Sequence, residues 1–476
     1  MRESRTNSGA AATDLLLDAL DRDSGVALHR QLEASIRAAV RAGRLPVGAS
    51  LPPSRVLAAS LGVSRGVVVA AYEQLSAEGY LTSRSGGYTR VNAGPETAPA
   101  AEPPPAPAPA APVVSFNYGR SDVSNFPRAA WLRSLRRVLT EAPAERLGYT
   151  SGQGDPEMRS ALAAYLNRVR GTVAHPGDIV ICSGYAQGVA LLVTVLAAGG
   201  RGGRPIAVED PSSNDDVWPL AAAAGLGPAG VPVGEHGVDI AALEGVDAQA
   251  LVLTPSHQWP TGGVLPAEAR AGVVRWARRT GALVVEDDYD AEYRYDRAAI
   301  GAMQGLAPDR VAYLGSASKT LAPGLRLGWM LLPRRLVGPV VEAKLRADRG
   351  SPAIDQLAFA DFLAAGELDR HLRRMRPVYR RRRDALLRAL ARHLPRLRPA
   401  GIAAGHHLVA WLPPGLDEAA AEQAAAAAGV AIAGLRRYYL AGNGPPGLLF
   451  GYASLSERAI EDGVARLGAA LGSHGS

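Results

Sequence analysis

Apolar side chains return every three or four residues over residues 28–42, and Gly43 follows them. This spacing predicts an amphipathic helix that ends at the glycine. Two further helices are expected over 55–61 and 65–78, because apolar residues recur there between turn signals. Ser64 immediately precedes the last helix and is placed to cap its first turn.

The segment after these helices has the pattern of a hairpin. Residues 80–82 and 88–91 are β-rich, and the Ser-Gly-Gly sequence at 85–87 is a turn signal. Three helices, a tight turn between the last two and a hairpin make a winged helix-turn-helix, which reads DNA with its third helix. Residues 1–92 carry 11 arginines and 8 acidic residues, a net charge of +3, which favours a nucleic-acid partner without establishing one.

The first residues of the third helix would enter the major groove, where an arginine reads guanine through two hydrogen bonds. Arg65 is therefore the expected base reader. Arg55, at the start of the second helix, and Arg84, near the wing, would hold phosphates or the minor groove. Ser64 and Gly86 complete the expected DNA-binding set. Each arginine taken alone is more simply a solvated surface charge, so the prediction depends on their arrangement.

Proline and alanine dominate residues 93–112, which show no periodic apolar face. This composition predicts an extended linker that reaches roughly 60 Å at about 3.1 Å per residue. The chain therefore divides into a DNA-binding domain at 1–92, the linker, and a large domain at 113–476. The length of 476 residues agrees with more than one domain, since single domains rarely exceed roughly 250–300 residues.

Helical stretches alternate with short strand-like runs from residue 113 onward. This alternation predicts an α/β fold with a mainly parallel sheet. The strand-like runs are 179–182, 206–209, 250–254, 282–286 and 311–314. Polar motifs follow the ends of these strands, where ligands bind in parallel sheets.

The motif SASK ends at Lys319, just beyond the last of these strands, and Arg326 follows in LAPGLRLGW. A lysine beside small hydroxyl residues can form a Schiff base with an aldehyde, and the arginine can hold a phosphate. Lysine is rare in this chain, since 50 of its 52 basic residues are arginines. The second lysine, Lys344 in the charged helical stretch VEAKLRADR, is expected to be unreactive.

Acidic and aromatic side chains follow another strand in the motif VVEDDYD. Asp287 emerges at the strand end, and Tyr289 follows two residues later. An aspartate that faces a protonated pyridine nitrogen keeps that ring an electron sink. A pair of acids at this place could equally bind a metal or cap a helix.

Two further motifs follow strands. In ICSGYAQ the chain passes from a strand into a helix, whose first amides, at Tyr185 and Ala186, would surround a phosphate. The polar turn SHQWPTG contributes His257 and Gln258. His257 alone is more simply structural, and no second histidine lies at metal-ligand spacing, so no metal site is expected.

Residues 28–91, from LHRQLEASIRAAV to SRSGGYTRV, resemble the DNA-binding domain of GntR-family bacterial regulators. The motifs HQWPTG, EDDYDAEYRY and SASKTLAPGLRLGW resemble pyridoxal-phosphate enzymes of fold type I, the aspartate aminotransferase class, over roughly 116–467. The combination resembles the MocR family of transcriptional regulators. This likeness implies an aminotransferase-like domain with a smaller C-terminal α+β subdomain.

The resemblance also implies the roles of single residues. Pyridoxal 5'-phosphate (PLP) would form a Schiff base with Lys319, with Asp287 at the pyridine nitrogen and Tyr289 near the phenolic oxygen. Tyr149 would reach the phosphate in the partner subunit, so a homodimer with shared sites and exchanged DNA-binding domains is expected. The other cofactor-binding residues implied are Tyr185, Ala186, His257, Gln258, Ser316, Ser318 and Arg326.

Three places depart from the family pattern. Val67 stands where a threonine is common, and residues 209–215 lack the Gly-Tyr pair and arginine of members that respond to amino acids. Residues 445–452 lack the arginine that clamps a substrate carboxylate in aminotransferases, although Arg436 or Arg437 could substitute from the preceding turn.

These features together predict a regulator that binds double-stranded operator DNA and senses PLP, or a small amine that condenses with it. The missing arginine favours PLP itself as the effector and hence control of vitamin B6 synthesis. The alternative is a PLP-dependent aminotransferase with a DNA-binding head, for which weak or no transaminase activity is expected. A cytoplasmic location is expected, because no signal peptide and no apolar run of about 20 residues is found.

Overall fold

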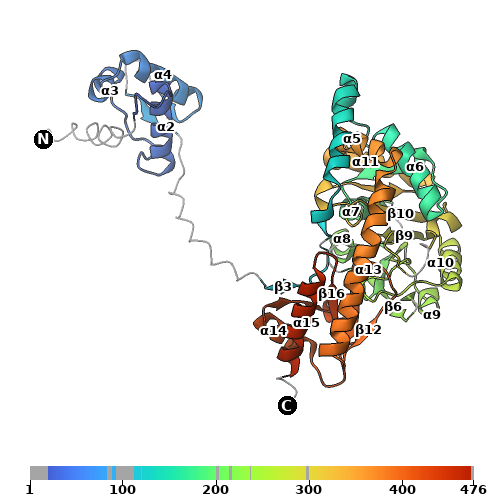
Figure 1. The fold of residues 1–476 in the computed structure, drawn as a ribbon. Coiled ribbons are helices and arrows are strands. Elements are labelled where there is room, and N and C mark those ends of the chain that lie inside the picture. Colours follow the sequence, from blue (N-terminus) through green and yellow to red (C-terminus); the bar gives the residue numbers. More distant parts are fainter. Residues whose placement is uncertain are drawn as a thin grey trace. The chain divides into compact units, whose positions relative to one another are not determined.

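The computed structural model divides the chain into two compact units, Met1–Pro109 and Ala110–Ser476, and each is described by itself (Figure 1). Arg84, Gly86 and nearly all of the expected linker lie outside the described residues. The described residues are 20–82, 88–92, 112–119, 121–199, 203–213, 217–235, 237–295 and 300–472.

The described residues of the small unit form three helices and a two-stranded antiparallel ribbon. Its elements are α2 (Leu28–Arg41), α3 (Ser54–Leu61), α4 (Arg65–Ala77), β1 (Leu81–Thr82) and β2 (Arg90–Val91). The apolar faces of the helices point inward and bury Leu32, Ile36, Leu57, Val68 and Leu75. The helices and the ribbon follow in the order that the hydrophobic pattern predicts for a winged helix-turn-helix.

A tight turn joins α3 to α4. Gly62 has φ 62° and ψ 32°, a left-handed conformation that a glycine adopts without a Cβ clash. Ser64 occupies the N-cap position of α4 with an extended backbone, but its side chain makes no capping hydrogen bond. The predicted position of Ser64 is confirmed, and its predicted capping bond is wrong, because the helix is held at this end without a side-chain hydrogen bond.

An eight-stranded sheet forms the centre of the large unit, in the order β4-β11-β10-β9-β8-β5-β6-β7. β11 and β7 are antiparallel to their neighbours, and the remaining pairs are parallel. All the predicted strand-like runs lie in this sheet. Its strands are β4 (Ile179–Cys182), β5 (Ile206–Asp210), β6 (Pro228–Gly234), β7 (Gly237–Val238), β8 (Ala250–Leu253), β9 (Leu283–Asp288), β10 (Val311–Ser316) and β11 (Gly328–Leu331).

Helices cover both faces of this sheet, which is why its central strands are apolar on both sides. One face packs against α7 (Tyr185–Ala198), α8 (Val217–Ala223) and α11 (Arg334–Asp348). The opposite face packs against α5 (Arg128–Glu141), α6 (Pro156–Arg170), α9 (Ile240–Glu244), α10 (Ala267–Thr280) and α12 (Ala353–Ala364).

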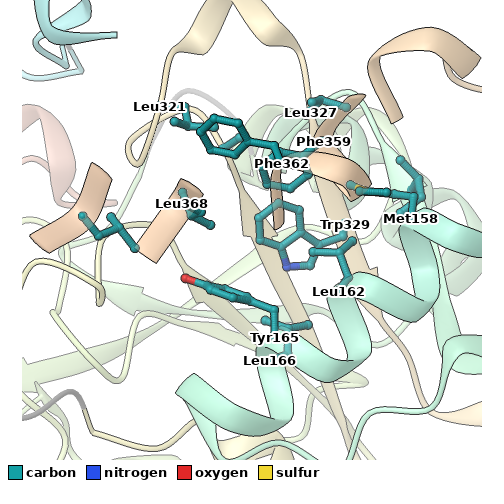
Figure 2. Close-up of a cluster of buried hydrophobic side chains, with 14 of the residues drawn as sticks. Met158, Leu162, Tyr165, Leu166, Leu321, Leu327, Trp329, Phe359, Phe362 and Leu368 are labelled. Carbon is teal, nitrogen blue, oxygen red and sulfur yellow. The ribbon is translucent and has the colours of Figure 1, made fainter. Parts of the chain in front are cut away.

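A cluster of aromatic and aliphatic side chains joins β11 to these outer helices (Figure 2). Trp329 of β11 lies between Leu162 of α6 and Phe359 of α12. The rings of Trp329 and Phe359 are stacked with their centroids 6.0 Å apart. This packing holds β11 as an antiparallel strand beside β10, the strand that leads to Lys319.

A smaller α+β part follows the long helix α13 (Glu367–His393), as the family resemblance predicts (Figure 1). Its four-stranded sheet has the order β12-β13-β16-β15. The elements are β12 (Arg398–Ala400), β13 (His407–Trp411), α14 (Glu418–Ala427), β15 (Ala433–Gly434), β16 (Gly447–Gly451) and α15 (Glu457–Gly472). A short parallel pair of β3 (Val114–Ser115) and β14 (Val430–Ala431) ties the start of the large unit to this part.

Candidate functional site

Lys319 follows β10 and reaches a pocket of about 490 Å³ at the carboxyl ends of the parallel strands. Its Nζ donates a hydrogen bond to the carbonyl oxygen of Gly119, at 3.1 Å, and lies 4.6 Å from the centre of the Tyr118 ring. Burial lowers the pKa of the Lys319 amine, although Asp290 and Asp287 act in the opposite direction. A lowered pKa makes the neutral amine more available to attack an aldehyde.

Two neighbouring aspartates at the end of β9 have different surroundings. Asp287 lines the pocket, as does Tyr289. Asp288 points to the other face of the sheet, where it pairs with Arg170 at 2.7 Å and accepts a hydrogen bond from Tyr313 at 2.7 Å. Period-two alternation along the strand therefore places one acid at the candidate cofactor site and buries the next in an ion pair.

Tyr289 is oriented by the turn that follows β8. Its hydroxyl donates a hydrogen bond to the carbonyl oxygen of His257 at 2.8 Å and lies 3.2 Å from His257 Nδ1. Burial and the nearby Asp290 carboxylate raise the pKa of Tyr289 well above its usual value, so the hydroxyl keeps its proton. This proton is donated to the His257 carbonyl oxygen, which holds the tyrosine at the pocket wall.

His257 and Gln258 do not line the pocket, although the sequence predicts both as cofactor-binding residues. His257 Nδ1 lies 3.0 Å from Asp290. The Gln258 amide nitrogen donates to the carbonyl oxygen of Pro211 at 2.9 Å, and its oxygen accepts from Thr261 at 3.0 Å. These contacts place both side chains behind the pocket wall, where they hold the turn.

The sequence did not predict that His257 lies beside a second histidine, because the two are far apart along the chain. His407, on β13, lies close to His257, and their ring centroids are 4.8 Å apart. Ligand atoms of His257, Asp290 and His407 lie within 4.8 Å of one another. His407 Nε2 contacts the carbonyl oxygen of Pro260 at 3.0 Å, and burial lowers its pKa well below the usual value. Neutral His407 therefore supports the turn through its contact with Pro260, and the absence of a metal stays a prediction.

The N-terminus of α7 faces the same pocket. Tyr185 and Ala186 line it, and no side chain caps the helix at Gly184. An added Cβ at Gly184 would lie in ordinary contact with the Arg326 guanidinium, at 3.5 Å, so this arginine lies beside the helix end, and the φ of 120° at this position favours glycine. Helix amides and an arginine guanidinium together bind phosphate well. The residues 183–186 are called the phosphate cradle below.

The lining of the whole pocket matches the chemistry of PLP. A lysine amine, an aspartate and a phosphate cradle converge in a space that is large enough for the cofactor. Ser316 and Ser318 also line it, as predicted. The amine suits the aldehyde, the aspartate suits the pyridine nitrogen, and the cradle suits the phosphate. The residues present therefore fit PLP.

Several lining residues were not predicted from the sequence. Tyr118 comes from the segment after β3, and its ring packs against that of Trp259 with centroids 4.1 Å apart. Glu209, at the end of β5, accepts hydrogen bonds from the Thr254 amide at 2.9 Å and hydroxyl at 2.8 Å. Burial raises the pKa of Glu209 to about 7. No local sequence signal marks these residues, because distant segments bring them together.

The two arginines that could bind a substrate carboxylate differ in their position relative to the pocket. Arg437 lines the pocket, and its half-exposed side chain pairs with Glu422 at 2.5 Å. Arg436 pairs with Asp417 at 3.3 Å and does not line the pocket. Tyr149 also lies outside the pocket lining of its own chain and is 96% exposed. Its exposure leaves it accessible to a second subunit.

Both predicted arginine contacts that the structure describes in the small unit lie on its surface. Arg55 and Arg65 lie in the first turns of α3 and α4, and both are exposed. The Arg65 side chain lies near Ser54, with Nε 3.5 Å from the hydroxyl oxygen. Neither helix has a side-chain cap at its N-terminus, so both helix ends face the surface with amide donors that suit phosphates.

Comparisons with known proteins define the class of the large unit. The family model for aminotransferase class I and II matches residues 112–467. The crystal structure of LysN, an alpha-aminoadipate aminotransferase from Thermus thermophilus complexed with N-(5'-phosphopyridoxyl)-L-leucine, is 30% identical with a TM-score of 0.68. That match covers 76% of this chain and 92% of the LysN chain. The large unit therefore has the fold type I aminotransferase architecture, and PLP is its cofactor.

Relatives along the whole chain define the family. The model for bacterial regulatory proteins of the gntR family matches residues 28–91. The probable rhizopine catabolism regulatory protein MocR of Rhizobium meliloti is 32% identical and covers 95% of each chain. The pyridoxine biosynthesis transcriptional regulator PdxR of Corynebacterium glutamicum is 33% identical, over 93% of this chain and 95% of PdxR.

The chain belongs to the MocR family of GntR-type transcriptional regulators, in which a DNA-binding domain precedes an aminotransferase-like domain. The family, the fold class and the cofactor expected from the sequence are confirmed. Within the described residues, the helices are too short or too polar to cross a bilayer.

Proposed function

We propose that this regulator senses PLP in its aminotransferase-like domain and changes its affinity for operator DNA when the cofactor binds. The observation that carries the proposal is the convergence of Lys319, Asp287 and the phosphate cradle on one pocket. The similarity to PdxR favours PLP itself as the signal, and with it control of vitamin B6 synthesis. A small amine that condenses with bound PLP is the other effector that this pocket suits.

Each part of the pocket has a separate task in this proposal. Lys319 would hold the cofactor aldehyde, and Asp287 would hold the pyridine nitrogen in its protonated form. Tyr289, whose hydroxyl donates to the His257 carbonyl oxygen, would lie near the phenolic oxygen, while Arg326 would neutralise the phosphate together with the amides of the phosphate cradle. Ser316 and Ser318 supply hydroxyl donors to the same phosphate. His257 and Gln258 position Tyr289 and the turn.

The proposed link from the pocket to DNA passes through a homodimer. The exposed Tyr149 would complete the phosphate site of the partner subunit, so cofactor binding would favour the paired state. The two DNA-binding units of the dimer, each attached through a long linker, would then bind the two halves of an operator. The DNA-binding units would be exchanged between the subunits. A ligand shifts such an equilibrium only by its difference in affinity for the two states. A cytoplasmic protein would meet both the cofactor and the DNA.

Operator binding titrated with PLP tests this function. The probe is a labelled duplex from the region upstream of the gene for this protein, followed by fluorescence anisotropy at fixed salt. We expect PLP to change the affinity of the wild type and to leave the affinity of Lys319→Ala unchanged. Lys344→Ala is unsuitable as a control because Lys344 is buried, so Arg346→Ala, an exposed cation of α11, serves instead.

Two results would contradict the sensor function. A wild type that shows no absorbance change with PLP would refute cofactor binding at Lys319. A wild type that binds PLP but holds its operator equally well at every PLP concentration would refute the sensor role. In the second case the large unit would bind the cofactor for another purpose.

The position of Arg437 favours a second candidate function, transamination. Its side chain lines the pocket, where it could pair with the carboxylate of an amino-acid substrate in place of the arginine missing before β16. The competing ion pair with Glu422 weakens this case. Formation of keto acids from amino donors, lost in Arg437→Gln, would support transamination; no turnover would favour the regulatory function alone.

A further inference from the structure

Lys344 has a place that its sequence context does not indicate. The charged stretch around it predicts an ordinary surface lysine, but its side chain is fully buried between α11 and α7. A buried ammonium group needs a partner charge and hydrogen bonds, because desolvation of an ion is costly. The groups that hydrogen-bond to Lys344 therefore show which part of the structure this lysine stabilises.

Lys344 is held by two side chains. Its Nζ donates to Asp348 Oδ2 at 2.6 Å and to Gln187 Oε1 at 3.3 Å. Gln187 also donates to Asp348 Oδ2 at 2.7 Å, so the three groups form a closed triangle, called the Lys344 cluster below. Burial raises the pKa of Asp348, but hydrogen bonds from Lys344, Gly350 and Gln187 outweigh it and lower the pKa overall. The charged form of the Asp348 carboxylate is therefore favoured.

The Lys344 cluster reaches the phosphate cradle through Gln187. The Gln187 Oε1 atom accepts a hydrogen bond from the backbone amide of Ser183 at 2.8 Å. Ser183 lies immediately before Gly184, the N-cap residue of α7. The same glutamine oxygen thus contacts the lysine ammonium on one side and the cradle backbone on the other. This bond joins the Lys344 cluster directly to the backbone of the phosphate cradle.

The cluster also reaches the segment that carries Tyr149. Asp348 Oδ1 accepts a hydrogen bond from the Gly350 amide at 2.9 Å. Gly350 lies so close to Thr150 that an added Cβ would be 2.7 Å from its hydroxyl oxygen. The ion pair between buried Lys344 and the more exposed Asp348 therefore lies between the phosphate cradle of its own pocket and the residue next to Tyr149.

We propose that Lys344 is a positioning residue for the cofactor phosphate. Through Gln187 it fixes the Ser183 amide and with it the phosphate cradle, and through Asp348 it fixes the segment of Tyr149. The inference rests on the proposed function, because it requires the phosphate of PLP to bind at the start of α7. Both lysines of the chain would then serve the cofactor site. Lys319 would contact the cofactor directly, and Lys344 would hold the residues that bind its phosphate.

Comparison of PLP with pyridoxal, which lacks the phosphate, tests the proposal. Both aldehydes are titrated by absorbance into the full-length wild type and Lys344→Met. We expect Lys344→Met to weaken PLP binding by about tenfold, the effect of losing about one buried hydrogen bond, and to leave pyridoxal binding unchanged. A lysine that serves only general stability would change both affinities in parallel, and that result would overturn the proposal.

Two further variants keep the test independent of folding. Gln187→Met removes the link to Ser183 and retains the Lys344–Asp348 pair, so it should repeat the selective loss for PLP even if Lys344→Met does not fold. Arg346→Met is the matched control, since Arg346 and Glu342 form an exposed pair with the same four-residue spacing on α11. It should bind both aldehydes like the wild type.

The outcomes separate this inference from the proposed function. A wild type that binds neither aldehyde refutes the cofactor site itself. A wild type that prefers PLP strongly, together with a Gln187→Met variant that keeps the full preference, refutes only the positioning role. Selective loss of PLP affinity in Gln187→Met supports the role.

Discussion

The DNA-binding face and the cofactor pocket place their charged groups in opposite surroundings. Arg55 and Arg65 are exposed at the ends of short helices, so water and salt screen them. Lys319 and Glu209 are enclosed. Burial lowers the pKa of Lys319 and raises the pKa of Glu209, so it favours the neutral form of each side chain. One region therefore acts through full charges that many ions can screen, and the other through groups whose protonation depends on the fold.

This difference predicts different responses to the solvent. DNA binding should fall steeply with salt, because an arginine that contacts a phosphate releases a counterion. Cofactor binding and the stability of the large unit should respond to pH more than to salt, because desolvation acts inside the pocket. Single substitutions in each region therefore test this contrast.

Glu209→Gln should produce the largest change. The folded state raises the pKa of Glu209 from 4.5 to about 7, so it binds the proton more tightly than the unfolded state. The resulting stabilisation is complete below about pH 4.5 and is lost as the pH rises through about 7. We expect the wild type to lose roughly 2–3 kcal/mol of unfolding free energy relative to Glu209→Gln between pH 5 and pH 8.

Urea unfolding followed by tryptophan fluorescence measures this effect in the large unit, since all 6 tryptophans belong to it. The titrations are made without added PLP, so that cofactor binding does not contribute. The glutamine keeps an oxygen that accepts from Thr254, which leaves ionisation as the main difference. Equal pH profiles for the two proteins would show that Glu209 does not titrate in this range.

Arg65→Ala should weaken operator binding by about 1–3 kcal/mol and reduce sequence preference, if this side chain reads a base. Arg44→Ala is a matched control, because Arg44 is exposed in the same unit but lies in the loop between α2 and α3. Anisotropy titrations at several salt concentrations separate the two kinds of contact. Equal loss on operator and random duplexes would assign Arg65 to phosphate contact.

Tyr72→Phe should have the smallest effect, a loss of about 1 kcal/mol from one buried hydrogen bond. The Tyr72 hydroxyl donates to the carbonyl oxygen of Pro52 at 2.9 Å and ties α4 to the start of α3. Hydrogen exchange of the α4 amides in the full chain measures the change. Unchanged protection would show that the apolar core alone fixes the two helices.

The sequence predicted the organisation of both units well, because local signals carry it. Periodic apolar residues and glycines marked the helices of the small unit, and Gly62 and Gly79 have the left-handed φ that their turns require. In the large unit, runs such as 311–314 are buried on both faces and read as strands. Motifs at their ends brought Lys319 and Asp287 to one pocket because the strands are parallel neighbours.

Other parts of the site depend on contacts between distant segments. The Lys319 amine bonds to Gly119, 200 positions earlier, and His407 reaches the turn at His257 from another sheet. Sequence reasoning placed His257 and Gln258 at the cofactor, but their side chains turn to Asp290 and Pro211. Side-chain direction in such a turn follows from the packing around it, which no short motif encodes.

The sequence by itself determined the class of this protein, the lysine and aspartate of its cofactor pocket and the helices that bind DNA. These depend on spacing and residue type, which act over a few positions along the chain. Only the tertiary structure decided that Tyr118, Glu209 and Arg437 line the pocket and that Lys344 is buried beneath the phosphate cradle. Burial and long-range hydrogen bonding are collective properties of the packed fold, so a charged stretch such as VEAKLRADR does not reveal which of its cations loses contact with water.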